Sequence, residues 1–174
     1  MIAAIMTFQM RALGLAVCLF TVALVSTATA QGKDPLTGTW KLNLAKSTYP
    51  AGVMPPQSGI RRFEDLGGGF IEVATDGVGA TGQRTGNRIV YKRDGREYTI
   101  TALTAAPVTA FTTIAFTVKS MSPYFVEYTT KIDGKLATTA TEVVSTDGKT
   151  YTTTVKGTNA QGQPITTITV YDRQ

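Results

Sequence analysis

The stretch GTWKLNLAKSTYP, residues 38–50, opens a region rich in strand signals and poor in helix signals. It carries the only tryptophan, Trp40, two residues after Gly38. Glycine allows a neighbouring group to approach the backbone closely, and an indole fills a large volume of core. We therefore expect Trp40 to close one end of a β-barrel.

Turn signals recur at short intervals after this opening. Asp-Gly pairs occur at 76–77, 94–95, 133–134 and 147–148, and NAQGQ at 159–163 has the composition of one more turn. Asp-Gly between strand-like runs is a strong hairpin signal because both residues tolerate positive φ. The runs between the turns are rich in threonine, valine and isoleucine, whose branched side chains suit a pleated surface.

The pattern predicts ten strands, at 38–45, 60–65, 69–75, 87–93, 96–102, 111–118, 124–132, 135–145, 149–157 and 164–172. Tight turns make consecutive strands antiparallel, and so long a meander closes into a barrel or folds into a sandwich. No linker divides residues 31–174, so we expect one all-β domain, an antiparallel up-and-down barrel of about 8–10 strands. Segment 46–59, with three prolines and two glycines, is expected to form an extended loop across one end.

Residues 1–30 have the pattern of a secretory signal peptide. Arg11 is followed by the apolar run Ala12 to Val25 and by Ala-Thr-Ala at 28–30, so the mature chain is expected to begin at Gln31. Met10 is an alternative start. An uncleaved anchor and a lipoprotein acylated at Cys18 are rival interpretations. We expect export to the periplasm or the medium, and no membrane span after cleavage.

Composition narrows the chemistry of the mature chain. The chain has no histidine, and its one cysteine, Cys18, lies in the expected signal peptide. Triad, thiol and histidine acid–base catalysis therefore lack their residues, and zinc, copper and haem lack their usual ligands. The formal net charge is +5, and it falls to +4 without Arg11. This bias is small for a nucleic-acid-binding protein. We expect no cofactor, no metal site and no nucleic-acid partner.

The Gly38-x-Trp40 pair, the β-meander and the ending VYDRQ resemble the calycins, which comprise the lipocalins and the fatty-acid-binding proteins. GTWKL is similar to the first strand of the fatty-acid-binding branch and ITVYDRQ to its last. The opening is also similar to exported bacterial proteins described as lipocalin-like. The resemblance implies that Trp40 packs at the closed end of the barrel beneath an arginine of the last strand. The matching residue is Arg173, and a guanidinium over an indole contributes about 0.5–2 kcal/mol.

The chain also departs from that family. Fatty-acid-binding proteins hold the ligand carboxylate with Arg-x-Tyr on the last strand, where this sequence reads Thr169-Val170-Tyr171. The tyrosine matches and the arginine does not, which argues against a carboxylate clamp. The prolines of segment 46–59 also exclude the two-helix lid of that branch, because proline interrupts helices.

Carboxylates are the remaining catalytic groups. Glu72, Glu127 and Glu142 lie in predicted strands, where two could meet as an acid–base pair, but their spacing selects no pair. Isolated strand carboxylates are usually solvated or paired with lysine. We therefore expect a protein that is not an enzyme.

Two sets of residues favour binding. One is a group of aromatic side chains that could line the barrel: Tyr91, Tyr98, Phe111, Phe116, Phe125, Tyr128, Tyr151 and Tyr171. The alternative is that these rings only fill the core. The other set is a basic strip on a hairpin: Arg84, Arg88, Lys92, Arg93 and Arg96. This strip could meet an anionic envelope component, or it could be an ordinary solvated face.

The sequence thus favours an exported barrel that binds a small apolar or amphipathic ligand, with Tyr171 as one polar contact. The alternative is a structural or interaction protein of the envelope, with a filled core and a basic contact surface. An interior cavity of about 300 Å³ or more would favour the binder.

Overall fold

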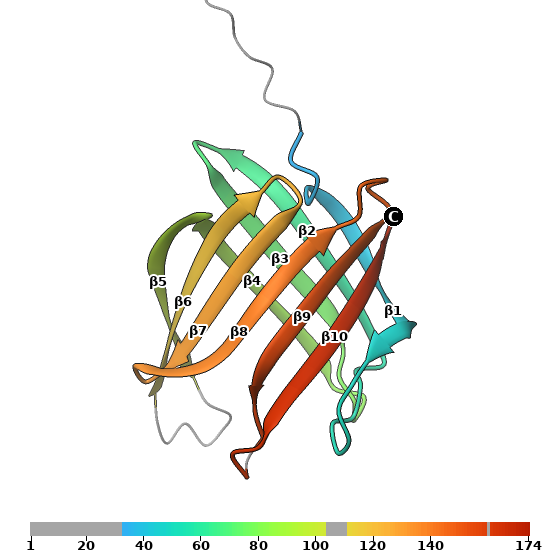
Figure 1. Cartoon of the computed structure of the whole chain (residues 1–174), viewed down its shortest axis with the longest axis vertical. Helices are drawn as coiled ribbons and strands as arrows, with labels where there is room; N and C mark the ends of the chain where they lie inside the picture. The colour runs from blue at the N-terminus through green and yellow to red at the C-terminus, as the bar shows by residue number, and fades with distance from the viewer. Residues whose placement is uncertain (1–32, 104–110, 160) are drawn as a thin grey trace, which may run out of the picture. The chain divides into compact units, whose positions relative to one another are not determined.

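The computed structural model describes residues 33–103, 111–159 and 161–174, without the side chains of residues 100–112 (Figure 1). These residues form ten strands, and no helix occurs among them. The strands are β1 (Gly38–Thr48), β2 (Ser58–Gly67), β3 (Phe70–Val78), β4 (Arg84–Lys92), β5 (Asp94–Leu103), β6 (Phe111–Ser122), β7 (Phe125–Ile132), β8 (Lys135–Val144), β9 (Thr150–Thr158) and β10 (Pro164–Arg173). The prediction of an all-β antiparallel barrel is confirmed. The expected signal peptide lies outside the described residues.

All ten strands belong to one antiparallel sheet with the order β4-β3-β2-β1-β10-β9-β8-β7-β6-β5. The first and last strands are hydrogen-bonded to each other, with Trp40 opposite Arg173. The sheet curls so that β1–β4 lie behind β6–β10 in Figure 1. Its two edge strands, β4 and β5, are not hydrogen-bonded to each other in the described residues. The barrel is therefore nearly, but not fully, closed.

Two of the four Asp-Gly pairs lie at predicted hairpin turns, where Gly134 and Gly148 have φ angles of 77° and 68°. Asp94-Gly95 instead opens β5, where Gly95 has a φ of 76° and the register with β6 shifts between Asp94 and Glu97. The prediction of a turn at Asp76-Gly77 is wrong, because this pair lies within β3. A Cβ on Gly77 would lie 2.5 Å from the Ser58 carbonyl oxygen, so this glycine serves a close strand approach. The turn between β3 and β4 falls instead at residues 79–83.

The closed end of the barrel is built around Trp40, which has no exposed surface. Its indole N–H donates to the Leu36 carbonyl at 2.8 Å, and the Arg173 guanidinium lies 4.1 Å from the ring centre. Arg173 also donates to the carbonyls of Thr37, Pro35 and Gly148. A Cβ at Gly38 would lie 2.7 Å from Arg173 Nη1, at a φ of 134°. Only glycine leaves room for this arginine, which explains the Gly-x-Trp spacing.

The segment between β1 and β2 is a loop, residues 49–57, with no helical turn. Val53 and Met54 on it are exposed. The two-helix lid is therefore absent, in agreement with the prolines of this segment. No helix in the described part of the chain could cross a membrane.

Candidate functional site

A cavity of about 340 Å³ lies inside the barrel. It is lined by inward-facing residues of β2–β4 on one side and of β6–β9 on the other. Its apolar wall is formed by Val73, Ile89, Ile114, Phe116 and Val155. Its hydroxyl groups come from Thr130, Thr138, Thr153, Tyr91 and Tyr128. This mixture of apolar and polar groups is suited to an amphipathic ligand.

A charged pair reaches the cavity from opposite walls. Arg61 on β2 lies beside Trp40 in the sheet register, and Glu142 lies on β8. Arg61 Nη1 donates to Glu142 Oε1 at 3.0 Å and to the Tyr151 hydroxyl oxygen at 2.6 Å. The Tyr151 hydroxyl in turn donates to Glu142 Oε1. The carboxylate is 4% exposed and the arginine side chain 26%.

Two buried oxygens of this wall lack a hydrogen-bond partner among the described residues. They are Glu142 Oε2 and Thr153 Oγ1, and both residues line the cavity. A buried polar atom without a partner costs about 1–3 kcal/mol. Both oxygens have almost no accessible surface, so a partner could reach them only if a side chain of the wall shifted.

Burial raises the pKa values of four tyrosines in this region. The Tyr91 and Tyr128 hydroxyl oxygens lie 2.5 Å apart. Burial raises the pKa of Tyr91 to about 12, and the negative charge of Glu142 adds to this effect. The pKa of Tyr128 is also raised well above its usual value, first by burial and then by Glu142. Burial likewise raises the pKa values of Tyr151 and Tyr171, although Arg61 opposes this effect at both.

These pKa values predict that stability falls as the pH rises from about 10 to about 12. Tyrosine ionises near pH 10 in an unfolded chain, whereas folded Tyr91 keeps its proton up to about pH 12. Above pH 10 the unfolded state binds fewer protons, so rising pH favours unfolding. Urea unfolding at several pH values, with phenolate absorbance, measures this loss. Tyr91→Phe should make the fall shallower, and constant stability across this window would contradict the assignment.

The predicted aromatic lining divides into several groups. Tyr91, Phe116 and Tyr128 line the cavity, and Tyr98 stacks on Phe116 with ring centres 5.8 Å apart. Tyr151 is fully buried beside Trp40, so it fills the core rather than the lining.

Three further members of that set lie elsewhere. Tyr171 packs against Tyr151 with ring centres 5.3 Å apart and is not part of the cavity wall. The prediction that Phe125 lines the cavity is wrong. Phe125 pairs with the outward-facing Val143, so strand alternation directs its side chain outward. The side chain of Phe111 lies outside the described residues.

Arg93 does not belong to the exposed basic strip that the sequence predicts. The Arg93 side chain is only 11% exposed and forms an ion pair with Asp34, which connects the residue between β4 and β5 to the segment before β1. Arg84, Arg88 and Lys92 do face outward on β4, and Arg96 lies on β5. Arg88 pairs with Glu72 at 3.4 Å and Arg96 with Asp94 at 3.7 Å, which offsets much of the positive charge.

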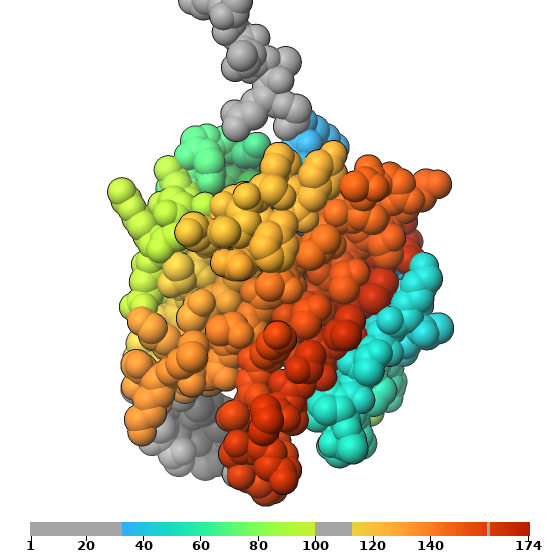
Figure 2. Space-filling view, in the orientation of Figure 1, coloured from blue at the N-terminus to red at the C-terminus, as the bar shows by residue number. Residues whose placement is uncertain are grey.

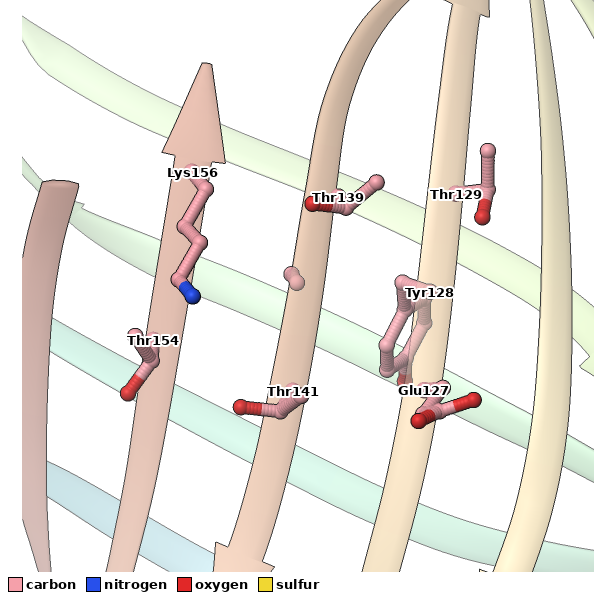
Figure 3. Close-up of a pocket in the computed structure, with 8 residues that line it drawn as sticks. Glu127, Tyr128, Thr129, Thr139, Thr141, Thr154 and Lys156 are labelled. Atoms are coloured by element: carbon pink, nitrogen blue, oxygen red, sulfur yellow. The ribbon is translucent and has the colours of Figure 1, made fainter. Parts of the chain in front are cut away.

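The outer face of the barrel offers a second hollow, over β7–β9 (Figure 3). Figure 2 shows this side of the molecule, where the side chains of β7–β10 form the outer wall. Threonines line the hollow, with the exposed Glu127 and Lys156 near them. No buried charged group lines this hollow among the described residues, in contrast to the interior cavity.

Arg61 is the site residue that sequence reasoning missed. Glu142 is among the three strand carboxylates considered from the sequence, and the expectation that such groups are solvated holds for Glu127 but not for Glu142. The described residues contain no cluster of three metal-ligating side chains. Among the residues of the structure that are described, Glu142 is the only carboxylate lining the interior cavity.

Solved structures share this architecture. Fatty-acid-binding protein 1 of Echinococcus granulosus has a TM-score of 0.52 and 16% sequence identity, covering 80% of this chain and 97% of that chain. The wild-type fluorescent protein UnaG has a TM-score of 0.53 and 16% identity, covering 79% and 96%. No protein-family model and no curated protein matches the sequence. At this identity the likeness shows the fold alone, a calycin-type barrel.

Proposed function

We propose that this protein binds a small apolar or amphipathic molecule in the barrel cavity and performs no chemistry on it. The observation that carries the proposal is the interior cavity of about 340 Å³, lined by apolar side chains and a few polar groups. Ligand pockets generally have volumes of about 300–1,000 Å³ and a lining of this kind. The fatty-acid-binding protein with the same fold is in keeping with this proposal.

The catalytic alternative has little support. An acid–base mechanism needs two groups that converge on the substrate, and the described part of the cavity wall holds no second carboxylate beside Glu142. Its Oε1 atom is already bonded to Arg61 and Tyr151. The geometry therefore favours a structural or recognition role for this carboxylate.

The alternative of an envelope interaction protein needs a filled core and a basic contact surface. The cavity argues against a filled core. The burial of Arg93 and the ion pairs of Arg88 and Arg96 weaken the basic surface. The binder remains the better-supported function.

A substitution that fills the cavity tests the proposal. Ala140→Phe places a ring in the cavity, because Ala140 faces inward on β8 opposite Tyr128. We expect it to weaken binding of the neutral dye Nile red by about tenfold or more, measured by dye fluorescence. Thr139→Phe is the matched control, because Thr139 is next to Ala140 on β8 and faces outward. Equal dye binding by both variants and by the wild type would place the dye outside the cavity.

We also propose that the protein is exported and that cleavage after Ala30 produces the mature chain. The support is the charge, apolar run and small-residue site of residues 1–30. The described strands begin at Gly38, so this cleavage would leave all of them in place. Intact mass analysis of the periplasmic or secreted protein should give a chain that starts at Gln31. A retained N-terminal segment would contradict cleavage.

A further inference from the structure

We infer that the cavity prefers a ligand with an uncharged polar head, such as an alcohol, over a carboxylate, and that Glu142 determines this preference. The inference deepens the proposed function and rests on it. It starts from the charges inside the barrel.

The described residues that line the cavity carry no net formal charge. Arg61 and Glu142 are the only charged residues among them, and they form an ion pair with an Nη1–Oε1 distance of 3.0 Å. On β10, the inward position next to Tyr171 on the same face is held by Thr169, which carries no charge. The positive charge of Arg61 is therefore balanced within the protein before any ligand enters.

An unpaired arginine in an apolar cavity would attract a carboxylate strongly. Arg61 lines the cavity and faces inward, so the exposed 26% of its side chain faces the ligand space. A carboxylate that approached this part would also approach Glu142. Attraction by one charge and repulsion by the other are similar in size at similar distances.

The anion would therefore give up its hydration without net electrostatic compensation, which is unfavourable in a partly apolar site. A hydroxyl group loses much less hydration. Its oxygen can accept a hydrogen bond from the N–H groups of Arg61 that Glu142 and Tyr151 do not use. Its proton can be donated to a hydroxyl oxygen of the cavity wall, such as that of Thr130.

The test compares 1-decanol with decanoate, which share a chain length and differ in the head group. Each is titrated against bound Nile red at about pH 8, where a free carboxylic acid is ionised. The wild type should bind the alcohol at least about tenfold more tightly than the acid. Glu142→Gln leaves Arg61 unbalanced, so decanoate should gain about tenfold or more in affinity and the preference for the alcohol should disappear.

Glu127→Gln is the matched control, because it makes the same change in net charge on the outer face of β7. It should leave the preference unchanged. Equal or tighter binding of decanoate by the wild type would overturn the inference, as would an unchanged ratio in folded Glu142→Gln. The proposed function would survive both outcomes. If dye and both ligands fail to bind, the proposed function and this inference both fail. The wild-type ratio decides the matter alone if Glu142→Gln does not fold.

Discussion

Trp40→Ala is expected to lower the free energy of unfolding by about 3–5 kcal/mol. The substitution removes a fully buried indole whose ring centre lies 5.5 Å from that of Tyr151. The indole N–H also donates a hydrogen bond to the Leu36 carbonyl, and the ring lies beneath Arg173. It would leave a cavity at the closed end of the barrel and deprive Arg173 of its aromatic surface. Urea denaturation of the purified protein measures the loss.

Phe70→Ala provides the comparison for this prediction. Phe70 is also aromatic, but it is 42% exposed at the start of β3, so its removal should cost much less. A Trp40→Ala protein whose melting temperature stays within about one or two degrees of the wild type would show that the indole does not hold this end together.

Arg61→Met should destabilise the barrel by about 3 kcal/mol, because it leaves the Glu142 carboxylate buried without its counter-charge. Tyr151 would remain as the only described donor to this carboxylate. Replacing both members of the pair, as in Arg61→Met with Glu142→Leu, should recover most of the loss, since no buried charge then remains.

A double-mutant cycle on urea unfolding separates the pair from its surroundings. The account requires that the double variant is more stable than Arg61→Met alone. If the double variant is the less stable of the two, or if Arg61→Met unfolds like the wild type, the two charges are not energetically coupled.

The fold could be predicted from local signals, and the site only in part: Tyr91, Phe116 and Tyr128 line the cavity as expected, but Arg61 was not predicted. Asp-Gly located the β7–β8 and β8–β9 hairpins, because it has a strong preference for positive φ that acts within a few residues. Gly77 shows the limit of this reasoning, because a glycine is needed there to let Ser58 of the neighbouring strand approach the backbone closely. A dipeptide pattern cannot distinguish these two uses.

The charged residues of the interior depend on distant pairing. Arg61 and Arg62 are adjacent, and a shift of one residue in register would exchange their faces. Arg61 faces inward because it stands opposite the inward-facing Trp40 in the register of β1 and β2. Its partner Glu142 is 81 residues away in the chain. Arg93 is likewise buried by Asp34, 59 residues distant. Neither pairing leaves a local signal.

The central claim is that a small molecule binds inside the barrel, and methyl NMR during titration with 1-decanol tests it most directly. The account predicts that resonances of Ala140, Val155 and Ile114, which line the cavity, shift in a saturable manner. Resonances of the outward-facing Val90 and Val143 should stay in place. Shifts confined to Val90 and Val143, or the absence of saturable shifts at the cavity methyls, would contradict binding in the barrel.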